Sequence, residues 1–381
     1  MIKKNLIFSA VIFLLLALLI EASSYFILKV LPPQITSEGK ALNMLAWESS
    51  YTERGLPIPP KGPREGYWGS RIGQKKADPY TGTIEPFVKV PGLLDITDKG
   101  YQIAGEEGAR AKCRVLIVGA SVAFGAYSSD IQHTYFSRIR EHLEDEGHSV
   151  VLYILASGGW TSNEEMAALR NYGLDIKPDI VVFVNGLNDL VIVKDAGSFP
   201  LRLQAINRTI YRPLNGSNTI RLIRSLKDYR AVINFYRRGI IRSSHPPLRP
   251  GGRSGVENYL ANMAEAKKLA GAHGFKVIYI LQPFILEKQR PSFLEKKILN
   301  VHSRRFHFWE LREDFIRARE GLSSLSDGKT SFFYDCSNAL SGERETTFAD
   351  IWHFSDRGHE LFSECSKRAI LDAIRDREKE D

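Results

Sequence analysis

Short apolar runs, each followed by small or polar residues, recur through the second part of the chain. Runs rich in β-branched residues predict buried strands at Val115–Val118, Val150–Leu155, Ile180–Val184, Lys276–Leu281 and, more weakly, Ser331–Tyr334. Apolar residues three or four positions apart predict helices near Tyr135–Glu146, Ser162–Tyr172, Val256–His273, Arg304–Arg319 and Ser355–Arg377. Such alternation is typical of a mainly parallel sheet with helices on both faces. The pattern therefore predicts an α/β domain over residues 111–381.

The first 31 residues have a different pattern. A short basic tail with Lys3 and Lys4 precedes fifteen uncharged residues, Leu6 to Ile20, of which all but Ser9 are apolar. This length suits the core of a signal peptide. The apolar character continues past Glu21 to Leu28, which gives a span long enough for a bilayer. We favour an uncleaved transmembrane anchor over a cleaved signal, and both alternatives place the rest of the chain outside the cytoplasm.

Residues 32–110 show no clear periodicity. Proline and glycine are frequent, as in Leu56–Pro63, so we expect an extended Pro/Gly-rich segment ahead of the domain. Whether this segment is a plain stalk or packs on the domain stays open.

A long basic insertion over residues 190–255 interrupts the alternation. From Leu190 to Gly255 the chain has thirteen Lys or Arg and two Asp, a net charge of +11, which exceeds the +8 of the whole chain. A lid or substrate wall that faces an anionic glycan or phospholipid headgroups is one interpretation, and a solvated helical hairpin is the other. Nucleic acid is not expected as a partner, because the domain is predicted to be extracytoplasmic and no aromatic-interleaved basic motif occurs.

Composition adds a few limits. Apolar residues make up 43% and charged residues 25% of 381 positions, as in ordinary globular proteins. Three cysteines do not form a disulfide framework. Cys336 and Cys365 could pair in an oxidising compartment, and Cys113, at the start of the first strand, is expected to be a buried free thiol.

The stretch from Cys113 to Gly125, CRVLIVGASVAFG, holds the first candidate for chemistry. A strand, a small-residue turn and a helix place Ser121 at the carboxyl end of the strand, where ligands bind in open α/β sheets. Ser121 is therefore a candidate nucleophile, although a helix-capping serine would give the same local pattern.

Three later stretches complete a set with Ser121. Ala156–Ser162 and Asn185–Asp189 follow the second and third predicted strands, and Asp350–His353 lies near the C-terminus. Together these four blocks resemble those of the SGNH (GDSL-type) hydrolase superfamily, in its membrane-anchored bacterial type. The resemblance implies a three-layer α/β/α sandwich with a mainly parallel, flavodoxin-like sheet. It also implies a serine esterase, with an acyl-ester substrate and no metal or cofactor.

The resemblance assigns roles to particular residues. Ser121, Asp350 and His353 correspond to a catalytic triad, in which the carboxylate orients the imidazole and the imidazole takes the serine proton. The backbone N–H groups of Ser121 and Gly159 and the side-chain amide of Asn188 correspond to an oxyanion hole. Gly158 is an alternative to Gly159, because the register of this block is uncertain by one residue.

The blocks also depart from the family pattern. Ala120 stands where the family has aspartate before the serine, Ile154 stands at or near the position of an asparagine, and Leu187 replaces the glycine before Asn188. These departures allow an unusual substrate or an inactive relative.

Other motifs give weaker predictions. His359–Ser363 lacks the second histidine of a zinc helix, so His359 is expected on the surface of the last helix. Asp189 is expected to brace its loop, while Trp160 and Trp352 flank the proposed site. The favoured function is an extracytoplasmic esterase that deacylates a cell-envelope carbohydrate. An O-acyltransferase that modifies a polysaccharide and an inactive binding module on the same fold are the alternatives.

Overall fold

The computed structural model describes residues 15–16, 18–20, 22–23, 37–60, 76–78, 80–84, 89–90, 94–97, 100–104, 113–191, 255–303 and 308–379. Contacts divide the chain into two units, Met1–Ala41 with Phe199–Arg238, and Leu42–Ser198 with Gly239–Asp381. The second unit contains the α/β domain. The basic insertion predicted for residues 190–255 lies outside the described residues almost entirely, as does most of the predicted anchor.

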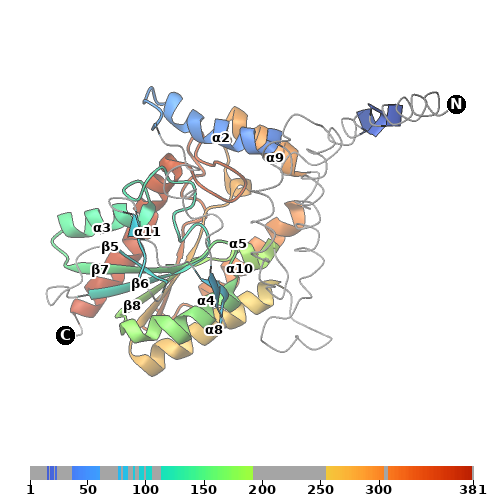
Figure 1. Ribbon diagram of the computed structural model, residues 1–381. Helices are drawn as coiled ribbons and strands as arrows, with labels where there is room; N and C mark the ends of the chain where they lie inside the picture. Colours follow the sequence, from blue (N-terminus) through green and yellow to red (C-terminus); the bar gives the residue numbers. More distant parts are fainter. Residues whose placement is uncertain are drawn as a thin grey trace. The chain divides into compact units, whose positions relative to one another are not determined.

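Six strands form the main sheet of the domain (Figure 1). Their order across the sheet is β10 (Ser331–Asp335), β9 (Lys276–Leu281), β8 (Ile180–Asn185), β6 (Cys113–Gly119), β7 (Val150–Ala156) and β5 (Gln102–Ala104). The first five of these are parallel, and β5 pairs antiparallel with β7 at one edge. The five parallel strands have the flavodoxin-like order, so the prediction of an α/β fold with a mainly parallel sheet is confirmed. All five predicted strands are present, and each is within two residues of its predicted ends.

Helices cover both faces of this sheet. The elements are α3 (Tyr135–Asp145), α4 (Ser162–Ala168), α5 (Leu187–Val191), α8 (Gly255–His273), α9 (Phe293–Ser303), α10 (Phe308–Leu325) and α11 (Asp356–Glu378). Helix α11 packs against α3, whereas α8 packs against α4 and α10 (Figure 1). These two groups are the outer layers of a sandwich. The central strands are buried on both faces, which explains why their sequences are continuous apolar runs.

The order of the strands decides where a ligand can bind. The chain leaves β6 toward β7 on one side and later returns to form β8 on the other side. The crevice at the carboxyl ends of the strands opens at this switch point. Ser121 follows β6 and Asn188 follows β8, so both border it.

The segment over residues 32–110 differs from the expectation of an extended chain. Ser37–Thr52 forms helix α2, and short strands occur at β1 (Lys76–Asp78), β2 (Gly82–Ile84), β3 (Lys89–Val90), β4 (Leu94–Asp95) and β5. From Leu42 to Tyr51 the chain has neither proline nor β-branched residues, which is compatible with a helix. Trp47 and Tyr51 are buried against Ala349, so this part of the segment packs on the domain.

The first unit is described only in short pieces. Helical stretches occur within residues 15–23, and their leucine and isoleucine side chains are exposed. In the described part of the chain, every helix falls short of the length and apolar character needed to span a bilayer.

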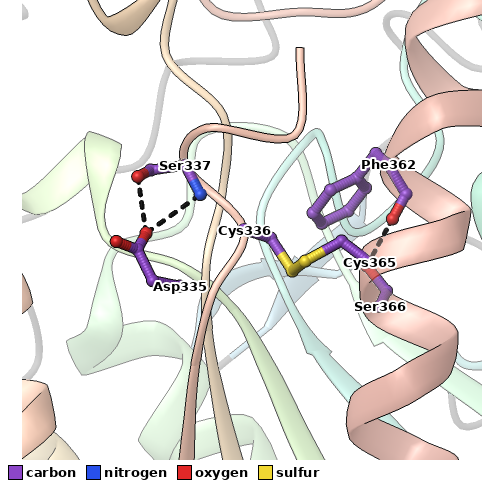
Figure 2. The surroundings of a disulfide bond; sticks show 6 residues. All are labelled: Asp335, Cys336, Ser337, Phe362, Cys365 and Ser366. Carbon is purple, nitrogen blue, oxygen red and sulfur yellow. Dashed lines mark hydrogen bonds between the residues drawn. A yellow bond between two sulfur atoms is a disulfide. The ribbon is translucent and has the colours of Figure 1, made fainter. Parts of the chain in front are cut away.

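A disulfide joins Cys336 and Cys365 (Figure 2). Cys336 directly follows β10 and Cys365 lies on α11, so the crosslink attaches the last helix to the edge of the sheet. Cys113 is free and buried, as predicted, and burial raises the pKa of its thiol to about 12.

Candidate active site

Ser121 lies in the turn that directly follows β6. Gly119, the last residue of the strand, packs so closely that a Cβ atom there would overlap the carbonyl oxygen of Val184 in β8. Val115–Val118 are fully buried and hold the strand in the middle of the sheet. The position of Ser121 is therefore set by close backbone packing between the two central strands.

Asp350 and His353 come from a hairpin between β10 and α11. Asp350 Oδ1 accepts hydrogen bonds from the backbone N–H groups of Trp352 and His353, at 2.7 and 2.8 Å. Asp350 Oδ2 accepts from His353 Nδ1 at 2.7 Å. The backbone N–H of Ala349 donates to His353 O at 2.9 Å, which closes the turn. One carboxylate thus fixes both the backbone and the ring of His353.

The hairpin places the imidazole of His353 next to the hydroxyl of Ser121. His353 Nε2 lies 2.8 Å from Ser121 Oγ, although the two residues are 232 positions apart in the sequence. Because Nδ1 donates to a carboxylate, the neutral ring has its lone pair on Nε2, and the Ser121 hydroxyl donates to it. The three side chains that the sequence predicts as a triad therefore lie in one hydrogen-bonded line.

Asp350 is ionised in this arrangement. Burial alone would raise the pKa of this carboxyl group, since its side chain is only 11% exposed. The His353 ring and the hydrogen bonds from His353 and Trp352 outweigh burial and lower the pKa below its ordinary value. A charged carboxylate can stabilise the imidazolium that forms when His353 accepts a proton.

Two glutamates from distant segments anchor residues 346–348, which lead into the hairpin. The backbone N–H of Thr346 donates to Glu53, which directly follows α2, at 2.6 Å. The backbone N–H groups of Thr347 and Phe348 donate to Glu295 of α9 at 2.9 and 3.0 Å. Three consecutive backbone N–H groups, a few residues before Asp350, thus donate hydrogen bonds to carboxylates.

A buried ion pair balances the charge of Glu295. Lys288 Nζ lies 2.7 Å from Glu295 Oε2, and both side chains are fully buried. Lys288 also donates to Glu345 O and to Thr347 Oγ1, at 2.6 and 3.0 Å. Sequence reasoning missed this network, because its members are ordinary charged residues with no motif around them.

Asn188 contacts the glycine block. Asn188 Nδ2 donates to Trp160 O at 2.7 Å, so its amide joins the third block to the second. An amide nitrogen carries two hydrogens, and this bond uses one of them. Gly158 and Gly159 both lie in the turn between Ser157 and Trp160, and Gly159 is exposed with φ at +86°. The choice between these two glycines stays a prediction.

The departures from the family pattern have local explanations. Gly186 has φ at +107°, and a side chain there would also crowd Leu281 and Tyr259. The glycine is therefore required one position earlier than in the family, and Leu187 is free to be a buried apolar residue. Ala120 is buried, and Ile154 lies inside β7, opposite Ile117, as a core residue.

Buried carboxyl groups support the loops behind Asn188. Asp189 accepts from Ser162 N and from Ser162 Oγ, at 3.0 and 2.6 Å, and so braces its loop as predicted. Burial raises the pKa of Asp189 to about 7 and raises that of Glu165 as well. Glu165 accepts from Asn185, which in turn accepts from Tyr259. No motif in the sequence indicated this group of buried carboxyl residues.

His359 is not on the helix surface, as the sequence suggested, but fully buried. Its Nε2 donates to Ala126 O at 3.0 Å. Burial lowers the pKa of His359 to about 4, so the ring is neutral near pH 7. His359 faces helix α3, where its ring stacks on the buried Tyr135, and this contact between helices is why the prediction was wrong.

An aromatic ring stacks on His353, and two tryptophans flank the site in the sequence. Tyr127 stacks on its imidazole, with ring centroids 5.2 Å apart and an angle of 23° between the planes. Trp352 is half-buried and stacks on Phe284. Trp160 is fully buried, so core packing accounts for it, and Trp352 is the better candidate for a substrate wall. Among the described residues, no cluster of His, Cys, Asp or Glu has an arrangement that could hold a metal ion.

Comparisons with known proteins add only distant similarities. No family profile and no curated protein sequence matches the chain. Among solved structures, the chain is similar to Axe2, an acetylxylan esterase from Geobacillus stearothermophilus, with 12% identity and a TM-score of 0.40 over 68% of this chain and 94% of that one. It is also similar to the acetyl xylan esterase AlAXEase, with 14% identity and a TM-score of 0.39 over 68% and 99%. The chain is also similar to LAE5, an alpha/beta hydrolase enzyme from the metagenome of Lake Arreo, with 13% identity and a TM-score of 0.41 over 68% of this chain and 95% of that one.

Proposed function

We propose that the chain is a serine esterase of the SGNH type. The observation that carries this proposal is the line from Ser121 Oγ to His353 Nε2, at 2.8 Å, and from His353 Nδ1 to Asp350 Oδ2, at 2.7 Å. A hydroxyl, a ring nitrogen that accepts its proton and a carboxylate that orients the ring are the parts required for acyl transfer. They lie at the switch point of the sheet, where such folds bind ligands.

In the first half of the reaction, Ser121 Oγ bonds to the ester carbonyl carbon while its proton moves to His353 Nε2. The carbonyl electron pair moves to oxygen, and its return expels the alcohol, which takes the proton from Nε2. In the second half, water gives a proton to Nε2 and attacks the acyl-enzyme. Collapse of this second intermediate releases the acid, and Ser121 recovers its proton. The sum is ester plus water to acid plus alcohol.

Backbone and side-chain donors would stabilise the oxyanion in both halves. We assign this role to the backbone N–H groups of Ser121 and Gly159 and to the second amide hydrogen of Asn188. The bond from Asn188 to Trp160 O fixes the plane of the amide, so the remaining hydrogen has a fixed direction. The open space at Gly159 leaves room for a substrate oxygen.

We further propose that the enzyme is anchored in a membrane and acts outside the cytoplasm, on an acyl ester of a cell-envelope carbohydrate. The apolar residues 6–20 and the basic tail before them support the anchor. The disulfide between Cys336 and Cys365 fits an oxidising compartment. The +11 charge of residues 190–255 favours an anionic glycan as the substrate.

A fluorophosphonate probe tests the nucleophile. We expect one probe per chain in the wild type and none in Ser121→Ala, while the control Ser324→Ala, on the exposed face of α10, labels normally. Hydrolysis of p-nitrophenyl esters from acetyl to palmitoyl should fall by at least about 10³-fold in Ser121→Ala. A folded wild type that takes up no probe would refute the proposal, and activity confined to short chains would exclude a lipase.

Asn188→Ala tests the oxyanion assignment. Loss of one donor typically lowers kcat by about 10²–10³-fold, so we expect a loss of that size with little change in KM. Asn258→Ala, at a half-buried asparagine on α8 that donates to Asn163, serves as the control and should retain wild-type kcat. An Asn188→Ala variant with unchanged kcat would remove this residue from the oxyanion hole.

A further inference from the structure

Tyr127 has a backbone conformation that residues other than glycine rarely adopt. Its φ is +69°, in the left-handed region, and it lies six positions after Ser121 on the same loop. This conformation costs free energy for a residue with a side chain, and it persists only when the surroundings impose it.

Hydrogen bonds fix the chain before Tyr127. The backbone N–H of Ala126 donates to Ser121 O at 2.9 Å, and Ala126 O accepts from the buried His359. Because both peptide groups of Ala126 are bound, the chain enters Tyr127 in a single direction.

Further contacts fix the chain after Tyr127. Ser128 N and Ser128 Oγ both donate to Gly125 O, at 3.2 and 2.7 Å. Ser129 N and Ser129 Oγ donate to Asp356 at 2.9 and 2.6 Å. The left-handed turn between these fixed points directs the Tyr127 ring onto His353.

The stack restrains a motion that the hydrogen bonds of His353 leave open. The bonds from the imidazole to Asp350 and Ser121 lie near the plane of the ring, so they resist movement within that plane. The ring can still tilt about the line through its two nitrogens. A second ring at 23° to it and 5.2 Å away blocks this tilt. Its π face also favours the imidazolium that forms during acylation.

Helix α2 supports Tyr127 in turn. Tyr127 packs against a cluster of Trp47, Tyr51 and Ala349, and the rings of Trp47 and Tyr51 lie 5.1 Å apart. Tyr51 also hydrogen-bonds to Asp356, the carboxyl group that binds Ser129. A helix from the early part of the chain therefore contacts both the tyrosine and the loop that carries it.

We propose that Tyr127 is a positioning residue for His353, and that Trp47 and Tyr51 of helix α2 hold it in place. The proposal rests on the esterase function proposed above. It makes α2 a functional part of the active site, although no residue of that helix belongs to the sequence motifs.

The test uses the full chain with Tyr127→Phe, Tyr127→Leu and Trp47→Leu, and with Tyr334→Leu as a control for the loss of a half-buried tyrosine elsewhere. A misplaced catalytic group can cost up to about 10²-fold in rate, so we expect Tyr127→Leu to lower kcat by about 10–50-fold with KM within about 3-fold. Tyr127→Phe keeps the ring and should retain kcat within about 3-fold. Trp47→Leu should also lower kcat, by a smaller factor than Tyr127→Leu. Tyr334→Leu should leave kcat unchanged.

Nitrogen NMR of the His353 ring gives a readout that does not need turnover. In the wild type and in Tyr127→Phe we expect a single tautomer with the proton on Nδ1, and in Tyr127→Leu a mixture of tautomers. Wild-type kcat and an unchanged ring spectrum in folded Tyr127→Leu would overturn the positioning role, while probe labelling of Ser121 would still support the esterase. Wild-type kcat in folded Trp47→Leu would overturn the role of α2. If the fluorophosphonate probe does not label the wild type, only the proposed esterase function is overturned. The ring spectra of His353 would then decide the positioning role.

Discussion

The loop that carries Ser121 and the hairpin that carries His353 meet at one hydrogen bond, but they are held by anchors of different charge. The serine loop is bound by His359 and Asp356, which burial keeps neutral near pH 7, since their pKa values are about 4 and about 8. The hairpin is bound by carboxylates, namely Asp350, with its lowered pKa, and Glu295, in its ion pair with Lys288.

This difference follows from where the two loops come from. The serine loop continues a central strand, so apolar packing and backbone contacts at Gly119 already determine its path. The hairpin lies between the edge strand β10 and helix α11, where less of the sheet can support it. Its backbone N–H groups are buried, and therefore need acceptors from elsewhere in the chain. We expect the two loops to respond differently to loss of charge and to pH.

Removal of the buried cation should have the largest effect. Lys288→Met leaves Glu295 as a buried charge without its partner, which typically costs about 3–5 kcal/mol of stability. Because Glu295 holds Thr347 and Phe348, we also expect kcat to fall in molecules that remain folded. Urea unfolding and ester hydrolysis measure the two effects.

An exposed ion pair provides the control for this variant. Arg140 and Glu144 lie one helical turn apart on α3 with side chains 31% and 45% exposed, so Arg140→Met should cost well under about 1 kcal/mol. A Lys288→Met protein as stable as Arg140→Met would show that the ion pair does not anchor the hairpin.

Asp356→Asn should change how stability depends on pH. Burial raises the pKa of Asp356 from 3.8 to about 8, so the folded state binds this proton more tightly than the unfolded chain does. Its contribution to stability is complete below about pH 4 and is lost as the pH rises toward about 8. Asparagine resembles the protonated acid, so the variant should lack this loss, which is on the order of a few kcal/mol.

Urea unfolding of both proteins at pH 5, 6, 7 and 8 isolates this effect, since all other titrating groups are shared. We expect the wild type to lose stability relative to Asp356→Asn over this range. Parallel stability curves would contradict a neutral anchor under the serine loop.

Glu53→Ala should have the smallest effect. The variant removes the acceptor of Thr346 N and Thr346 Oγ1, and a net hydrogen bond contributes about 0.5–1.5 kcal/mol. We expect a loss of about 1 kcal/mol in urea unfolding and a decrease in kcat of about 3–10-fold, with KM nearly unchanged. Glu48→Ala, within helix α2, is the control. An unchanged kcat would limit Glu53 to a role in stability.

The sheet and most helices were predictable, because a buried parallel strand is a continuous apolar run and few other structures produce one. Helices α2, α5 and α9 were not predicted. In α2, nearby prolines and glycines hid a helix of 16 residues whose buried face, Trp47 and Tyr51, packs on Ala349. Such a partner cannot be found from local periodicity.

The three central side chains of the site were predicted from the resemblance of the sequence blocks to the SGNH pattern, and of the three only Ser121 directly follows a strand. Their supports were not predicted. Glu53, Glu295 and Lys288 contact the hairpin from segments that only the folded chain brings together. The burial of His359 also depends on tertiary packing, because a histidine on an amphipathic helix can face either side.

The crosslink between Cys336 and Cys365 encloses the hairpin but not the serine loop. A disulfide acts mainly by limiting the freedom of the unfolded chain between the two cysteines. The stretch that gains most from oxidation is thus the one that supplies the proposed base. If the chain is exported as we propose, oxidation of the two thiols would stabilise this stretch only after secretion.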